Sequence, residues 1–127
     1  RLVNFLATGR PSNPVVLTGD IHSNWVNDIK ADFANPDSAS IATELVVTSI
    51  SSSGDGSDTR EATAGILAEN PFVKFFNGQR GYVTCELSPA QLKADYRVLD
   101  YVSQPDSPIS TRASFVIQSG NPGALRL

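Results

Sequence analysis

Three consecutive apolar residues, Val15, Val16 and Leu17, are followed by a turn at Gly19, and this pattern constrains the fold more than any other stretch. An apolar run without alternation is typical of a strand that is covered on both faces, as in layered α/β folds. Asp20 and His22 come just beyond the expected C-terminal end of this strand. Ligands often bind at such a position, because loops at strand ends converge while the sheet holds them in place.

The rest of the first half predicts two helices and a second strand. A short helix is expected over residues 1–7, and the β-branched residues of "IATELVVTSI" predict a strand over residues 41–50. The loop "SSSGDGSD" follows. A second helix is expected over residues 59–69, with Asp58 as its N-cap.

The second half of the chain has β character. In "RGYVTCEL" apolar and polar side chains alternate, with Val83, Cys85 and Leu87 on the apolar side. Ser88 and Pro89 then predict a single helical turn. Two further strands are expected at "ADYRVLDYV" and "RASFVIQS", separated by a proline-rich turn. This order of elements indicates a sheet-based α/β layer fold that lacks its beginning.

Length and charge restrict the class of function. The chain has 127 residues, enough for one domain or part of one. No apolar run approaches the roughly 20 residues that span a bilayer. Its net charge of −3 argues against a phosphate backbone as a partner. We therefore expect no membrane span and no nucleic acid as a stable partner. The chain starts at Arg1 inside a helix-compatible pattern, which suggests a piece of something longer.

Asp20 and His22 are the first candidates for chemistry, and His22 is the only histidine in the chain. A carboxylate and a neutral imidazole are common metal ligands, and the DxH spacing lets both side chains face one region. The same pair also fits a surface-loop aspartate and a hydrogen-bonded structural histidine. Spacing alone favours this second, structural interpretation.

Other residues also have two interpretations. Cys85 could be a thiolate nucleophile or ligand, but its place on the apolar side of a strand favours a small buried residue. Trp25 either stacks on a ligand or covers the core, and the second is commoner. Arg80 fits a phosphate contact and the capping of a strand start equally well. The loop "SSSGDGSD" lacks the lysine of a phosphate-binding loop, which favours a flexible surface loop.

Three separated segments together carry a resemblance to a known family: "VVLTGDIHSNWVNDI", "TELVVTSISSSG" and "NPFVKFFNGQRGYVTCELSPAQLKADYRVLDYV". In this order they resemble the C-terminal part of the PhoD-like alkaline phosphatases, which are secreted metallophosphoesterases. The resemblance implies a four-layer α/β/β/α sandwich, of which residues 1–127 would be the C-terminal portion of a single catalytic domain. It also implies an extracytoplasmic location.

The resemblance makes Asp20 and His22 the expected catalytic metal ligands. Related metallophosphoesterases have GHxH where this chain has GDxH, and a hard carboxylate oxygen suits calcium better than an imidazole does. The resemblance implies a mixed site, with His22 on iron and Asp20 on calcium. The implied reaction is attack of a metal-bound hydroxide on phosphomonoesters and phosphodiesters.

The remaining metal ligands of the family lie upstream of this segment, so Cys85 does not match the family's ligand cysteine. Two protein ligands are too few for a stable pair of metals. We therefore expect the isolated chain to be inactive, with the missing N-terminal part of the same protein as its partner. The alternatives are a non-catalytic β-rich binding module, in which Asp20 and His22 only order a turn, and a catalytically dead relative.

Overall fold

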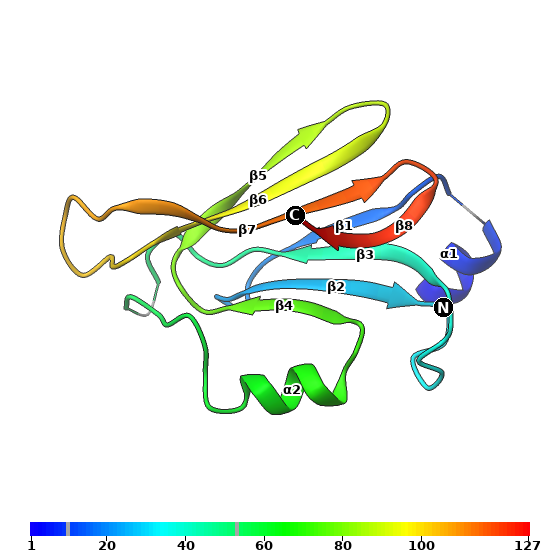
Figure 1. Ribbon diagram of the computed structural model, residues 1–127, viewed down its shortest axis with the longest axis horizontal. Coiled ribbons are helices and arrows are strands. Elements are labelled where there is room, and N and C mark those ends of the chain that lie inside the picture. The colour runs from blue at the N-terminus through cyan, green and yellow to red at the C-terminus, as the bar shows by residue number, and fades with distance from the viewer. Residues whose placement is uncertain (10, 53) are drawn as a thin grey trace.

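The computed structural model describes residues 1–9, 11–52 and 54–127. In this part of the chain, two four-stranded sheets face each other and two short helices lie outside them (Figure 1). The protein is thus mostly β-sheet. The elements in chain order are α1 (Leu2–Gly9), β1 (Val15–Thr18), β2 (Asn24–Lys30), β3 (Ser40–Val46), α2 (Thr63–Glu69), β4 (Val73–Asn77), β5 (Gly81–Leu87), β6 (Gln91–Leu99), β7 (Ile109–Gln118) and β8 (Asn121–Arg126).

The first sheet, sheet A, has the strand order β1-β3-β2-β4. Strand β1 is parallel to β3, whereas β2 is antiparallel to both β3 and β4. The strands β1, β3 and β4 therefore run in one direction, and their C-terminal ends meet at the same edge of the sheet. The loops that follow these three strands build the candidate site described below.

Strand β1 confirms the strand expected at the apolar run, but the expectation that both of its faces are covered is wrong. The side chain of Leu17 is 61% exposed. In the part of the chain that the structure describes, β1 is the outermost strand of sheet A and pairs with β3 on one side only. Strand β3 confirms the second expected strand, although it leaves the sheet after Val46 rather than at residue 50.

Helix α2 begins later than the sequence predicts. Its N-cap position is Ala62, without a side-chain cap bond, so the expected cap at Asp58 is wrong. The carboxylate of Asp58 instead pairs with Arg112, with a distance of 2.6 Å between Nε and Oδ1. Because Arg112 lies 54 residues further along the chain, a tertiary contact has overridden the local capping pattern.

The second sheet, sheet B, is antiparallel throughout, with the order β5-β6-β7-β8. Its first three strands confirm the three that the sequence predicts. The helical turn expected at Ser88 is wrong, because this segment is the tip of the β5–β6 hairpin. There the backbone N–H of Ser88 donates to the carbonyl of Gln91 at 2.9 Å, which closes a turn between paired strands.

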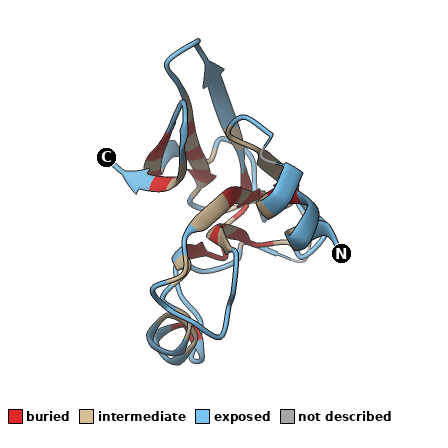
Figure 2. Ribbon diagram, turned by 90° about the vertical axis from the view of Figure 1, so that its right-hand side faces the viewer, coloured by how far each residue is buried: buried red, intermediate tan, exposed pale blue. Residues whose placement is uncertain are grey.

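The core lies between the two sheets, where buried segments of each face the other (Figure 2). Its centre is a group of three rings, with Phe75 from sheet A against Tyr96 and Phe115 from sheet B at centroid distances of 5.3 and 5.6 Å. The Tyr96 hydroxyl also donates to the carbonyl of Trp25 at 2.9 Å. Burial raises the pKa of Tyr96 far above its ordinary value, so the neutral hydroxyl is kept as a donor that links the sheets.

Cys85 corrects a further expectation, because it is exposed rather than buried. It does lie on the inner face of sheet B, since it pairs with Ala94, which is part of the core. Sheet A does not extend over this part of β5, and Leu87 on the same face is 79% exposed. The apolar face expected from the alternation in β5 is therefore the inner face of sheet B, although no described residues cover it at Cys85 and Leu87.

Candidate metal centre

The loop that joins β1 to β2 carries Asp20 and His22 in an unusual backbone conformation. Both residues have positive φ angles, 72° at Asp20 and 55° at His22. The N–H of Ile21 between them donates to the carbonyl of Gly19 at 2.9 Å, which forms a tight turn. Left-handed backbone in non-glycine residues costs about 1 kcal/mol or more each and clusters at functional sites.

The side chains of Asp20 and His22 are not engaged by other described residues, so their donor atoms are available to bind a ligand. Asp20 is exposed and His22 is half-buried, and within the described part of the chain neither side chain makes a hydrogen bond or ion pair. The structural interpretation requires the His22 imidazole to be held by hydrogen bonds, and no such bond is made by the described residues. A carboxylate oxygen and an imidazole nitrogen on one tight turn fit the donor types that calcium and iron accept.

The described residues do not by themselves gather enough ligands for a metal site. No group of three or more histidine, cysteine, aspartate or glutamate side chains is gathered within residues 1–9, 11–52 and 54–127. A structural or catalytic metal takes at least three protein ligands in most sites. The Asp20 carboxylate and the His22 imidazole are suitable donors for a metal, but two ligands are an incomplete set. Further ligands would have to come from outside these residues.

Arg80 ties the site loop to two other segments. The side chain is only 4% exposed, and its Nη1 donates to the carbonyl of His22 at 2.7 Å and to the hydroxyl of Thr48 at 3.3 Å. Its Nε donates to the carbonyl of Gly54 at 2.8 Å. Of the two interpretations of Arg80, a phosphate contact and a strand-start cap, neither describes these contacts, in which the guanidinium joins the site loop to two points of the connection between β3 and α2.

Two buried asparagines brace the same edge of sheet A, and sequence reasoning missed both. The Nδ2 of Asn24 donates to Oδ1 of Asn77 at 3.1 Å, and Oδ1 of Asn24 accepts from the backbone N–H of Thr48 at 3.0 Å. Asn77 also donates to Asp58 at 2.9 Å. A fully bonded polar network of this kind rigidifies the loops around it.

The loop at residues 51–58 is anchored rather than free over its described part, from which residue 53 is excluded. Oδ1 of Asp55 accepts from the backbone N–H groups of Val102 and Ser103 at 2.6 and 2.8 Å. These backbone hydrogen bonds lower the pKa of Asp55. The expectation of a flexible surface loop is wrong for these residues, since long-range bonds fix them.

Trp25 pairs with Phe76 on the face of sheet A opposite to the core, because Val26 and Phe75 beside them point into the core. The expectation that Trp25 covers the core is therefore wrong. The Trp25 ring meets Phe76 edge to face at a centroid distance of 4.6 Å, and its Nε1 donates to the Ser23 hydroxyl at 2.8 Å. Trp25 also lines a hollow of about 320 Å³ that borders Gly19 and Ile21 of the site loop. This hollow lies next to the candidate ligands.

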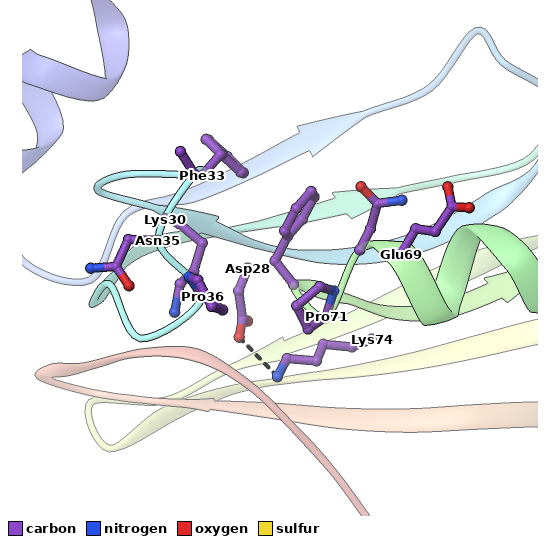
Figure 3. Close-up of a pocket in the computed structure, with 11 residues that line it drawn as sticks. Asp28, Lys30, Phe33, Asn35, Pro36, Glu69, Pro71 and Lys74 are labelled. Atoms are coloured by element: carbon purple, nitrogen blue, oxygen red, sulfur yellow. Dashed lines mark ion pairs between the residues drawn. The ribbon is translucent and has the colours of Figure 1, made fainter.

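A larger hollow of about 420 Å³ lies at the opposite end of β2, away from these ligands. Figure 3 shows it between Phe33, Pro36 and Pro71, with the ion pair of Lys74 and Asp28 (3.2 Å) on its wall. Asn24 near the site and Lys30 in this hollow are the two ends of β2, which puts them about 20 Å apart. The hollow therefore takes no part in the candidate metal centre.

The ion pair of Asp58 and Arg112 predicts a pH dependence of stability. The hydrogen bonds from Arg112 lower the pKa of Asp58 below its ordinary 3.8. A carboxyl with a lowered folded-state pKa stabilises the fold above its unfolded pKa, and this contribution is lost as the pH falls through the folded value. Because both side chains are partly exposed, Asp58→Asn should lower the unfolding free energy by about 1 kcal/mol near pH 7.

Urea unfolding near pH 7 and near pH 2 measures this effect, and the difference between the protein and Asp58→Asn should shrink at the lower pH. Asp100→Asn, at an exposed position after β6, is the matched control and should change little at either pH. An Asp58→Asn deficit that is equal at both pH values would contradict the assigned role.

Comparison with known proteins identifies the family of the chain. The family model described as PhoD-like phosphatase matches residues 1–96, which is most of the chain. The chain belongs to the PhoD-like phosphatase family. The resemblance in the three sequence segments is thereby confirmed.

Relatives within the family match the chain closely but are much longer. Alkaline phosphatase D of Bacillus subtilis (strain 168) is 48% identical over 123 residues, which cover 97% of this chain and 21% of that protein. A solved structure titled "Structure of PhoD" superposes with a TM-score of 0.94 at 46% identity, over 100% of this chain and 24% of that one. This chain thus spans about a fifth of the length of the curated relative.

In the part of the PhoD-like chain that the structure describes, neither helix is long and apolar enough to cross a membrane.

Proposed function

We propose that this chain is the C-terminal portion of the catalytic domain of a metal-dependent phosphomonoesterase and phosphodiesterase, and that it supplies the GDxH ligands of the metal site. The observation that carries the proposal is the loop after β1, where Asp20 and His22 have no partners among the described residues. Membership of the PhoD-like phosphatase family supports a phosphoric ester hydrolase. The substrates are phosphate esters.

Each ligand has a distinct role in this proposal. The imidazole of His22 holds iron, and the carboxylate of Asp20 holds calcium, for which a hard oxygen donor is suited. When bound, such cations activate a nucleophile and stabilise negative charge on the transferring phosphoryl group. The protein's own part is to keep both side chains on one rigid turn at the edge of sheet A.

The proposal also requires a longer protein, in which the N-terminal portion completes the metal site and the remaining layers of the α/β/β/α sandwich. Two features support it. This chain spans 21% of the length of alkaline phosphatase D from Bacillus subtilis. The inner face of β5 is open at Cys85 and Leu87, although apolar inner faces of packed sheets are normally covered. We further propose an extracytoplasmic location and no stable nucleic-acid partner.

Hydrolysis of p-nitrophenyl phosphate and bis-p-nitrophenyl phosphate by the longer protein tests the function. Activity that a chelator removes and that iron with calcium restores is the expected result. Activity that is unaffected by prolonged chelation, or an absence of hydrolysis of both esters by a folded, metal-loaded protein, would overturn the proposal.

The open inner face of sheet B leads to a prediction about Cys85. In the longer protein, we expect its thiol to react with a maleimide at least about 10-fold more slowly than a cysteine on the other face of β5, because the missing layer covers it. The comparison is Glu86→Cys in a Cys85→Ser background, read by peptide mass mapping. Partial desolvation by neighbouring atoms raises the pKa of the otherwise exposed Cys85 thiol, so both proteins are labelled at the same alkaline pH, where both thiols ionise. Equal labelling rates would show that no further layer packs there.

A further inference from the structure

One buried side chain, that of Arg80, bonds the backbone of the loop that carries Asp20 and His22. Arg80 comes 58 residues after His22 in sequence, yet its Nη1 lies 2.7 Å from the His22 carbonyl oxygen. The same side chain bonds Thr48 of the loop after β3 and Gly54 of the next segment. The guanidinium therefore links the loop after β1 to two points of the connection between β3 and α2.

The segment just after Gly54 is packed backbone against backbone on the residues that precede Arg80. A Cβ atom on Gly56 would lie 2.0 Å from the carbonyl oxygen of Gly78, and Gly56 has a φ of +76°. The N–H of Gly78 donates to the carbonyl of Ser57 at 2.9 Å. The residues before Arg80 and the residues around Gly54 thus form a rigid base on which the guanidinium sits.

The strained turn needs such support. Asp20 and His22 both have left-handed backbone, and conformations of this kind persist only where the surroundings over-determine them. The hydrogen bond from the buried Arg80 to the His22 carbonyl is a part-buried, charge-assisted contact at one of these two residues, and charge-assisted bonds are stronger than neutral ones.

We propose that Arg80 is a positioning residue, which holds the His22 backbone so that the imidazole is presented to the metal in a single orientation. This inference rests on the proposed function, in which His22 is a metal ligand. In this role Arg80 acts through the peptide carbonyl of His22 and not as a metal ligand. Residues that orient metal ligands in this way typically change metal affinity by about 10- to 100-fold when they are replaced.

Lysine cannot replace arginine in this role. The fork of the guanidinium lets Nε and Nη1 donate to Gly54 and His22 at the same time from fixed directions, whereas an ammonium is a single point donor on a flexible chain. Arg80→Lys therefore keeps the positive charge and most of the volume but loses the geometry. Arg80→Lys therefore distinguishes an effect of the guanidinium geometry from an effect of the positive charge.

The test uses the longer protein loaded with iron and calcium, in its native form and as Arg80→Lys and Arg80→Ala. Metal loss into excess chelator is followed by elemental analysis of desalted samples, and hydrogen exchange of the peptide covering residues 19–24 is measured in the metal-free proteins. We expect both variants to release metal at least about 10-fold faster. We also expect faster exchange in this peptide, and a loss in kcat larger than any change in KM.

Arg97→Ala is the control, because the Arg97 guanidinium bonds the Thr111 hydroxyl within sheet B at 2.6 Å and takes no part in the bonds from Arg80 to His22, Thr48 and Gly54. It should leave metal release and exchange as in the native protein. If Arg80→Ala does not fold, Arg80→Lys decides the question alone. A lower melting temperature with unchanged metal release and exchange would overturn the proposal and leave Arg80 a stabilising residue only.

Failure of the proposed function has a different signature. A native protein that holds no iron or calcium, or a His22→Ala variant that retains the native metals and activity, removes the metal role of His22 itself. Faster hydrogen exchange at residues 19–24 in the metal-free Arg80 variants would then still show that Arg80 supports the backbone of this turn. Native metal binding with no effect of Arg80 contradicts only the positioning role.

Discussion

His22→Ala in the longer protein is expected to lower kcat for p-nitrophenyl phosphate hydrolysis by at least about 100-fold, because removal of a ligand costs more than removal of a residue that orients one. The fold should survive, since the half-buried imidazole makes no hydrogen bond or ion pair within the described chain. Steady-state kinetics measures the loss, and a circular dichroism melt checks the fold.

The size of this effect separates the phosphatase from the alternative of a β-rich binding module. If the protein is instead a binding module, Asp20 and His22 only order a loop. His22→Ala would then leave the rate of p-nitrophenyl phosphate hydrolysis within about threefold of the native value. Asn13→Ala changes another residue with positive φ, in the loop before β1, and serves as the control for backbone effects. A native kcat in a folded His22→Ala protein would contradict the assignment of His22.

Phe115→Ala is expected to cost about 3 to 5 kcal/mol of unfolding free energy, the usual range for truncating a buried aromatic ring. Phe115 is fully buried, its ring lies 5.6 Å from Phe75, and Arg126 stacks over both rings at 6.0 and 5.6 Å. The cavity would open between the two sheets, where the backbones of both are fixed by their ladders and cannot collapse into it.

Urea unfolding measures this loss, with Tyr82→Ala as the control. Tyr82 is an aromatic residue of sheet B that is 40% exposed, and its truncation should cost about 1 kcal/mol or less. A Phe115→Ala cost as small as that of Tyr82→Ala would show that the two sheets do not share a packed core around this ring.

The strands that sequence patterns found are those whose own residues carry an apolar run, as in β1, or a local alternation, as in β6. Strand β2 was missed because two residues on its inner face are polar: Asn24 is satisfied by Asn77, 53 residues away, and Asp28 by the N–H of Ala124 and by Lys74. Strand β8 was missed because Pro122 and Gly123 interrupt its pattern. Only long-range partners make these segments strands.

The position of the candidate site could be predicted from the sequence, but the side chains that hold its loop in place could not. The position of Asp20 and His22 after an apolar strand was enough to place them at a sheet edge. The bond from Arg80 to His22 links residues 58 apart, and no local pattern signals it. The bond from Arg112 to Asp58 is of the same kind, which is why a capping motif was expected there instead.

A native mass spectrum of the longer protein, beside that of its His22→Ala variant, tests the central claim most directly. The account predicts that the native protein carries the added mass of iron and calcium, and that His22→Ala lacks the iron. A native protein without bound metal, or a variant that keeps the full metal content, would contradict the account.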